Sequence, residues 1–79
     1  MTKRIEILHF GPMCAARGRS EEVVSTEAAT PGDLYAELGL GASYPASALR
    51  VAVNDRLTSW DAPLGDGDRV VFLSPSSGG

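Results

Sequence analysis

The sequence has little reactive chemistry: one cysteine, Cys14, and one histidine, His9. A single cysteine excludes an internal disulfide. The two residues are candidates for a nucleophile and its base, but no carboxylate accompanies them at a recognisable spacing to orient the imidazole. A free cysteine is more often a small buried hydrophobe, so the sequence favours a structural role. No group of His, Cys, Asp and Glu has metal-ligand spacing and no glycines form a phosphate loop, so we expect no bound metal or cofactor.

Long apolar runs and basic runs are lacking as well. No stretch approaches the roughly 18 apolar residues of a membrane span, and none has the layout of a signal peptide. We therefore expect a cytoplasmic protein without a membrane partner. The 7 lysines and arginines are scattered and the net charge is −3, which argues against nucleic acid as a partner. The net negative charge would favour binding to a basic groove on a partner protein. The same charge is also explained by ordinary solubility alone.

The length of the chain limits what it can do alone. With 79 residues, of which 43% are apolar, it is long enough for one domain with one modest core. It is too short for a deep active-site cleft between two layers. We therefore expect no active site of its own.

The first third of the chain is typical of two strands joined by a short helical segment. In Lys3–Phe10, isoleucines alternate with charged residues and further apolar residues lie on the opposite face, which predicts a central strand. Gly11-Pro12 ends this strand. The segment Met13–Arg17 is predicted as one helical turn, and Glu22–Thr26 as the hairpin partner of the first strand.

One clear helix follows. Thr30 is a good N-cap, Pro31 suits the first helical position, and Asp33 lies at the positive end of the helix dipole. Two leucines four residues apart form an apolar stripe, and Gly39 ends the helix. The remaining predicted elements are a loop at Leu40–Ser47, strands at Leu49–Val53, Leu57–Trp60 and Val70–Leu73, and tight turns at Asn54-Asp55 and Pro63–Asp68.

This order of elements predicts an α+β fold of the β-grasp, ubiquitin-like type. Such a fold has a small mixed sheet crossed by one main helix, with the first and last strands side by side at the centre. A ferredoxin-like α+β sandwich also fits short alternating elements but requires a second helix, for which Met13–Arg17 is the candidate. We expect the β-grasp domain to occupy residues 1–73, and a flexible tail ending in Gly-Gly to occupy residues 74–79.

The tail carries the strongest functional signal. Gly78 and Gly79 have no Cβ, so the backbone there can enter a narrow channel and an enzyme can reach the terminal carbonyl. The terminal carboxylate is ionised at neutral pH and is a poor electrophile until an activating group such as adenylate is attached. Its natural uses are acyl-adenylate, thiocarboxylate and isopeptide chemistry. A frayed chain end or the remnant of an expression tag is the alternative explanation of the same pair.

Several blocks of the sequence resemble a single family. They are Ile5–Phe10 with Arg17-Gly18, Thr30–Leu34, Val51–Asp55, and Pro63–Val70 followed by Gly78-Gly79. Over nearly the whole chain these blocks resemble the small subunit of molybdopterin synthase. The ordered turns, last strand and Gly-Gly also recur in the thiamine-biosynthesis sulfur carrier and other ubiquitin-like sulfur carriers. Phe10, Arg17 and the length of the first strand favour the molybdenum-cofactor branch.

The resemblance implies a non-catalytic, sulfur-donating role. In that family a partner adenylating enzyme uses ATP to convert the terminal glycine, here Gly79, to an acyl-adenylate, and a sulfur-delivering protein then yields a thiocarboxylate. The tail inserts into the large subunit of the synthase, a heterotetramer, which transfers two sulfurs from successive carriers to cyclic pyranopterin monophosphate. The positions that would contact the large subunit are Phe10, Leu57, Leu73 and Pro75, with Gly78 giving access to the tail.

Other interpretations stay open. A sulfur carrier for thiamine synthesis or tRNA thiolation, a ubiquitin-like protein modifier and a plain interaction module would all use the same fold. Phe10, Leu57 and Leu73 are also the kind of residue that a strand buries in its own core. The chain departs from the family pattern at Leu73, where an aromatic is common, and at Ser74–Ser77, which is more polar than the usual tail. Both departures would weaken docking to a partner.

Overall fold

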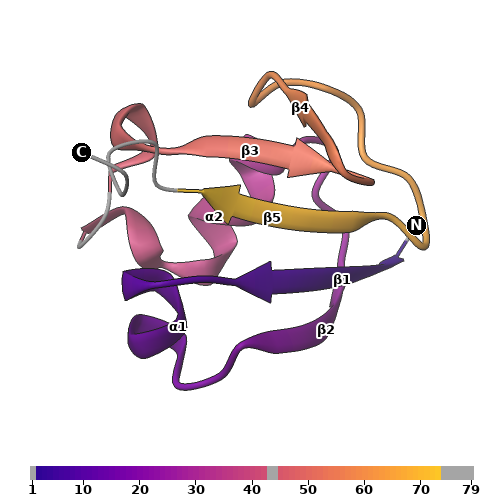
Figure 1. The fold of residues 1–79 in the computed structure, drawn as a ribbon. Helices are drawn as coiled ribbons and strands as arrows, with labels where there is room; N and C mark the ends of the chain where they lie inside the picture. Colours follow the sequence, from indigo (N-terminus) through magenta and orange to yellow (C-terminus); the bar gives the residue numbers. More distant parts are fainter. Residues whose placement is uncertain (1, 43–44, 74–79) are drawn as a thin grey trace.

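The chain folds into a mixed sheet of five strands in the order β2-β1-β5-β3-β4, with helix α2 across one face (Figure 1). The structure is a computed structural model, and it describes residues 2–42 and 45–73. Its elements are β1 (Lys3–His9), α1 (Pro12–Arg17), β2 (Glu21–Thr26), α2 (Pro31–Leu38), the 3-10 turns η1 (Leu40–Ala42) and η2 (Ala46–Ala48), β3 (Arg50–Val53), β4 (Arg56–Thr58) and β5 (Arg69–Leu73).

β1 and β5 form the centre of the sheet and run parallel, whereas the other neighbouring strands are antiparallel. β5 therefore ends in the middle of the sheet, between β1 and β3. This is the β-grasp arrangement expected from the order of elements, and that prediction is confirmed. The ferredoxin-like alternative is wrong: α1 has only 6 residues and lies beside the end of β1 rather than across the sheet (Figure 1).

Some element boundaries differ from the predicted ones. β1 ends at His9 rather than one residue later, because Gly11 adopts a φ of 56° and turns the chain into α1. The helical turn predicted after the first strand is the helix α1, and the loop predicted after α2 contains the two 3-10 turns. The predicted strand Leu57–Trp60 ends at Thr58, because Trp60 turns inward and packs against the core.

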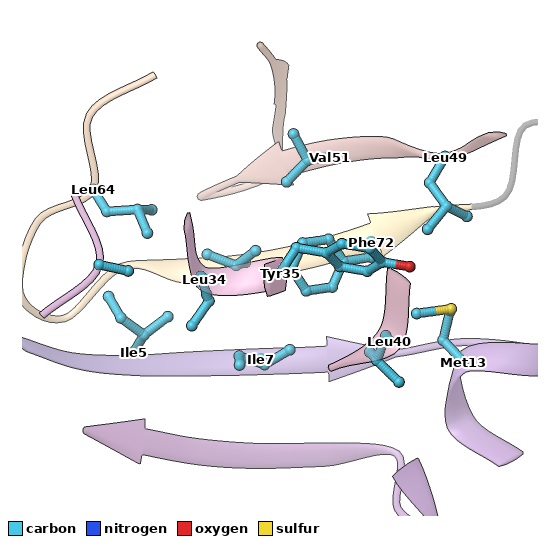
Figure 2. Packing of buried hydrophobic residues seen from close by; sticks show 12 residues of the cluster. Ile5, Ile7, Met13, Leu34, Tyr35, Leu40, Leu49, Val51, Leu64 and Phe72 are labelled. Atoms are coloured by element: carbon cyan, nitrogen blue, oxygen red, sulfur yellow. The ribbon is translucent and has the colours of Figure 1, made fainter. Parts of the chain in front are cut away.

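Apolar side chains fill the space between α2 and the sheet (Figure 2). Ile5 and Ile7 of β1 and Val70 and Phe72 of β5 point towards Leu34 of α2, and all five are 0% exposed. Every second residue of the two central strands therefore lies in the core. Complete burial of such side chains supplies most of the stability of a domain this small.

Three aromatic rings pack together in this core. Phe72 lies edge-on to Tyr35, with ring centroids 5.0 Å apart and planes at 62°. Trp60 stacks on Phe72 at 5.8 Å with planes at 9°, and it is edge-on to Tyr35 at 5.4 Å. Because each ring contacts the other two, the cluster ties β5 to α2 and to the segment that follows β4.

The ends of α2 follow from the local sequence. Thr30 is extended, with a φ of −139°, and its hydroxyl oxygen accepts a hydrogen bond from the backbone N–H of Asp33 at 3.1 Å. Pro31 occupies the first turn, where its missing N–H costs nothing. Gly39 adopts the left-handed φ of 73° and donates its N–H to the carbonyl of Ala36. The predicted start and stop of this helix are confirmed.

Two turns fix the end of the sheet opposite the end of β5. Asn54 and Asp55 have φ values of 52° and 69°, as required of a two-residue turn between twisted antiparallel strands. The Asp68 carboxylate accepts the backbone N–H of Gly65 at 2.7 Å and the side-chain amide of Asn54 at 3.0 Å. The Asn54 side-chain oxygen accepts the backbone N–H of Arg69 at 3.1 Å. These bonds join both turns and hold β3 and β5 in register.

Candidate functional site

The face of the sheet away from α2 is the candidate functional site. Successive side chains of a strand point to opposite faces. In β1, the buried core positions Ile7 and His9 flank Leu8, which therefore lies on the opposite, open face. In β5, Val71 takes the corresponding place between two core residues. In Figure 1, α2 passes behind β5 and β3, so it covers only the other face.

The strand register places four apolar side chains in one row across the open face. Leu8 lies opposite Val71, which in turn lies opposite Ala52. Ala52 lies opposite Leu57 of β4. The two central residues are each 7% exposed, whereas Leu57 is 64% exposed. The row is therefore a flat apolar floor with a projecting side chain at its β4 end.

Two further apolar residues extend this surface where β1 and β5 finish. His9 lies opposite Phe72 in the parallel pair, so the residues that follow them, Phe10 and Leu73, are neighbours. Phe10 is 58% exposed and Leu73 is half-buried. Arg50 of β3 lies opposite Leu73 and adds a positive charge at this end. We define the apolar patch as Leu8, Phe10, Ala52, Leu57, Val71 and Leu73.

The structure brings together the predicted contact residues that it describes. Phe10 and Leu57 are exposed large apolar side chains, so neither is a core residue, and Leu73 lies on the same face. The other predicted site residues lie outside the described residues: Pro75, Gly78 and Gly79. The patch adjoins the end of β5, which is the strand that leads into them.

Three members of the patch, Leu8, Ala52 and Val71, were missed as contact residues by sequence reasoning. The face on which Val71 and Ala52 lie depends on the residues that stand opposite them in neighbouring strands. Val70–Leu73 is an uninterrupted apolar run, and such a run assigns no residue to a face. The length of this apolar run was nevertheless a usable signal. A strand that is apolar on both faces buries one face in the core and has the other face available for a partner.

A polar pair bounds the open face beyond the row that contains Leu8. Arg69 donates its Nε–H to the Glu6 carboxylate at 2.6 Å, and both side chains are partly exposed. This hydrogen bond, together with the negative charge of Glu6, raises the pKa of the Arg69 guanidinium. A shallow hollow beside this pair is lined by Arg4, Glu6, Val23 and Gly67.

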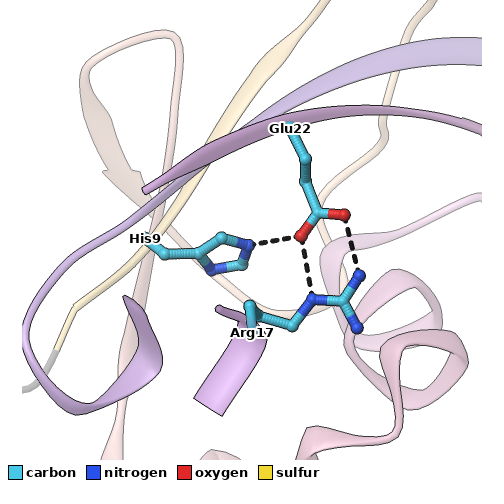
Figure 3. Close-up of polar contacts among 3 residues, drawn as sticks. All are labelled: His9, Arg17 and Glu22. Atoms are coloured by element: carbon cyan, nitrogen blue, oxygen red, sulfur yellow. Dashed lines mark hydrogen bonds and ion pairs between the residues drawn. The ribbon is translucent and has the colours of Figure 1, made fainter. Parts of the chain in front are cut away.

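A buried polar cluster lies on the α1 side of the sheet (Figure 3). The Glu22 carboxylate accepts hydrogen bonds from Arg17 Nε at 2.8 Å and Arg17 Nη2 at 2.7 Å. His9 Nε2 lies 2.7 Å from the same carboxylate, and the His9 and Glu22 side chains are 0% and 5% exposed. The two hydrogen bonds from Arg17 outweigh the effect of burial and lower the pKa of Glu22 to about 2.

The cluster contains a carboxylate partner for His9, which the spacing of residues along the sequence did not predict. That partner is Glu22. His9 is nevertheless closed to substrates, because its side chain is 0% exposed and its Nδ1 is buried with no partner among the described residues. Cys14 is a half-buried residue of α1. The described geometry therefore gives His9 a structural role.

Two further findings concern residues 2–42 and 45–73. Within these ranges no group of three or more His, Cys, Asp or Glu side chains is arranged to hold a metal ion. None of the helices described there is both long and apolar enough to cross a membrane.

Replacing Glu22 by glutamine is expected to lower the free energy of unfolding at neutral pH by about 2 kcal/mol, because Arg17 loses a charged partner in a largely buried cluster. The folded-state pKa of about 2 lies below the ordinary value of 4.5. The contribution of Glu22 is therefore complete above the ordinary pKa and is lost as the pH falls towards the folded-state pKa. Denaturant unfolding of both proteins across this range measures the effect.

The matched control is Glu21→Gln, which changes the neighbouring, exposed carboxylate. It is expected to alter stability by less than about 0.5 kcal/mol. A Glu22→Gln deficit that stayed constant between neutral and acid pH would contradict the assigned role of the carboxylate charge.

Comparison with known families decides the class of this protein. The profile of the ThiS family matches residues 7–79. The chain belongs to the ThiS family. As a ThiS-family protein it is ubiquitin-like and of the sulfur-carrier or small-modifier kind, which confirms the predicted superfamily. The comparison with curated proteins found no significant match.

Solved structures similar to this ThiS-family chain include two molybdopterin-related proteins. The putative molybdopterin converting factor subunit 1 of Pyrococcus furiosus is 27% identical, with a TM-score of 0.77 over 92% of this chain and 98% of that chain. A chain from the complex of subunits 1 and 2 of the molybdopterin-converting factor of Helicobacter pylori 26695 is 31% identical, with a TM-score of 0.61 over 96% of this chain and 99% of that chain.

A third similar structure carries a different name. Small archaeal modifier protein 1 of Haloferax volcanii is 19% identical, with a TM-score of 0.75 over 92% of this chain and 98% of that chain. At that identity the likeness establishes the shared fold alone. The same ThiS-family fold therefore occurs in proteins whose names refer to molybdopterin synthesis and in proteins named as modifiers.

Proposed function

We propose that this chain is the sulfur carrier of molybdenum cofactor synthesis, the small subunit of a molybdopterin synthase. The observation that carries the proposal is the 31% identity, over 96% of this chain, to a chain of the Helicobacter pylori complex of two molybdopterin-converting factor subunits. The apolar patch supports it, because a carrier whose tail enters another protein needs a docking surface next to the tail. Burial of exposed apolar residues such as Phe10 and Leu57 would stabilise that contact.

The reacting group in this proposal is the carboxylate of Gly79. A partner adenylating enzyme transfers AMP from ATP to a carboxylate oxygen and releases pyrophosphate. A sulfur-delivering protein then supplies the sulfur that replaces the AMP-bearing oxygen, which leaves a thiocarboxylate. Gly78 has no side chain, so the backbone can pass through the narrow entrance of each partner site.

The large synthase subunit is the proposed docking partner. It docks on the apolar patch and on Pro75, receives the tail, and supplies the residues that catalyse sulfur transfer to the pterin precursor. This chain contributes the sulfur and the contact surface, and holds no cofactor itself. The thiocarboxylate sulfur acts as the nucleophile, and the reaction returns Gly79 to a carboxylate when the acyl carbon is hydrolysed.

The decisive experiment is an intact-mass measurement. The chain is expressed with its adenylating enzyme and a sulfur source, and its mass is expected to rise by the difference between one sulfur and one oxygen atom. The charged carrier is then mixed with the large subunit and the pterin precursor, and the mass is expected to return to its starting value as the dithiolene product forms.

The alternative functions give different results in the same experiment. A carrier for thiamine synthesis or tRNA thiolation would gain the sulfur but leave the pterin precursor unchanged. A protein modifier would appear as a covalent adduct on lysine residues of other proteins. A chain that gains no sulfur in the presence of an active adenylating enzyme would overturn the carrier proposal.

Phe10→Ala is expected to weaken binding to the large subunit by about 2 kcal/mol, roughly 30-fold in Kd, because a projecting aromatic side chain is a typical interface anchor. Its effect on the free energy of unfolding should stay below about 1 kcal/mol, since the side chain is largely exposed. Calorimetric titration and thermal unfolding of the same protein measure both quantities.

The control for this experiment is Val23→Ala, which truncates an exposed apolar side chain of β2 outside the patch. It is expected to leave the affinity within about twofold of the parent. Equal losses for both variants, or an unchanged affinity for Phe10→Ala, would remove the patch from the interface.

A further inference from the structure

The outer edge of β2 is the longer of the two unpaired strand edges in the described sheet. β2 has 6 residues, whereas β4 at the opposite edge has 3. An open strand edge presents N–H and C=O groups that can pair with another strand. β2 therefore offers more main-chain pairing than β4 does.

The outward-facing backbone groups of this edge can be identified from the register. His9 donates its N–H to the carbonyl of Ser20 at 2.8 Å, so the backbone N–H and C=O of Ser20 point towards β1. Hydrogen-bonded pairs alternate along an antiparallel ladder, so the backbone groups of every second residue after Ser20 also point towards β1. Glu21, Val23 and Ser25 then direct their N–H and C=O groups away from the sheet. No backbone hydrogen bond from elsewhere in the described chain reaches these groups.

The side chains along this edge are complementary to a second copy of themselves. When two β2 strands pair antiparallel about Val23, each Val23 meets its own copy and Glu21 meets Ser25. Arg19 and Glu27 flank the strand, are both exposed, and lie equally far from Val23 in the sequence. If the pairing continues past both ends of β2, Arg19 of each chain lies opposite Glu27 of the other, which gives two such pairs. Opposite charges placed in this way stabilise a strand pair.

We propose that β2 is a homodimerisation edge, through which two copies of this chain join their sheets in an antiparallel pair centred on Val23. The charges select this register. Centring the pair one residue earlier sets Glu21 against Val23, and centring it one residue later sets Glu21 against Glu27. Only the register centred on Val23 combines an apolar pair with two oppositely charged pairs.

This surface is separate from the one used in the proposed function. Self-pairing uses the outer backbone edge of β2, whereas the apolar patch lies on the open face of the other four strands, and its nearest member is Leu8, which stands opposite Glu21. Self-pairing can therefore occur without occupying the apolar patch.

The experiment measures association and its location together. Sedimentation equilibrium on the full chain, up to about 1 mM, is expected to show a reversible dimer in the affinity range of weak complexes. Hydrogen exchange is expected to slow with protein concentration at the amides of Glu21, Val23 and Ser25, which the isolated chain leaves open. A monomer at every concentration, or protection elsewhere, overturns the proposal.

Charge exchange tests the register. Glu27→Arg sets Arg19 of one copy against an arginine of the other and is expected to weaken the dimer about tenfold, as two attractive pairs become repulsive. Adding Arg19→Glu to the same chain restores both pairs and should restore the affinity. The matched control is Asp61→Arg, the same charge change at an exposed residue beyond β4. Failure of the double variant to recover contradicts the register.

Val23 tests the centre of the pair. Val23→Lys places two ammonium groups together and is expected to weaken the dimer at least tenfold, whereas the β-branched Val23→Thr should retain it. Thermal unfolding at low concentration verifies that both variants are folded. Thiocarboxylate formation at Gly79 should be unchanged in both, so failure of this proposal is distinguishable from failure of the carrier proposal.

Discussion

A single residue added after Gly79 is expected to abolish sulfur transfer, with at least a thousandfold loss of activity, while thermal stability stays unchanged. The proposed chemistry takes place on the terminal carboxylate, and an added residue moves that carboxylate away from Gly79. The described core is built from residues that precede the tail. Single-turnover transfer to the pterin precursor and the melting temperature are measured on the same preparation.

The control for the extended chain is a version whose additional residue is removed by a protease before the assay. It is expected to recover full activity, which excludes misfolding as the cause of the loss. Full activity of the uncleaved, extended chain would show that the terminal carboxylate is not the reacting group, and the carrier proposal would fail with it.

Phe72→Ala is expected to lower the free energy of unfolding by about 3 to 5 kcal/mol. Phe72 is 0% exposed and contacts both Tyr35 and Trp60 in the core. A loss of this size is a large share of the roughly 5 to 15 kcal/mol that stabilises a typical domain. Denaturant unfolding measures the loss, and Trp60 fluorescence is a convenient probe because its ring stacks on Phe72.

The two phenylalanines of this chain form a matched pair for this experiment. Phe10→Ala removes the same side chain from a position that is 58% exposed, and it should leave the domain folded. Phe72→Leu keeps most of the buried volume and should cost less than Phe72→Ala. A Phe72→Ala protein as stable as Phe10→Ala would mean that the aromatic cluster does not stabilise the core.

Much of the fold was predictable because its local sequence signals agree with the tertiary structure. Thr30 and Gly39 set the limits of α2 through hydrogen bonds within a few residues, so their effect is visible in the sequence. Trp60 was placed wrongly in a strand, because its β propensity is overridden by packing against Phe72. That contact joins residues distant in the sequence, and no local pattern encodes it.

The candidate site was only partly predictable for the same reason. Phe10 and Leu57 were expected as contact residues from a resemblance, while their sequence pattern alone fits a core equally well. Their exposure follows from β1 ending at His9 and from the edge position of β4, which are properties of the assembled sheet. The cluster around Glu22 was not foreseen, because its partners come from β1 and α1 and meet only in the fold.

The parallel pairing of β1 with β5 has a consequence for folding kinetics. It joins residues near the two ends of the sequence, such as Glu6 and Arg69, so the contact order of the central pair is high and closing this loop carries a large entropic cost. Before residues 69–73 insert, the remaining strands can form only two separate hairpins, β1 with β2 and β3 with β4. The apolar patch is therefore incomplete in a nascent chain until β5 inserts, and the proposed docking surface exists only in the finished fold.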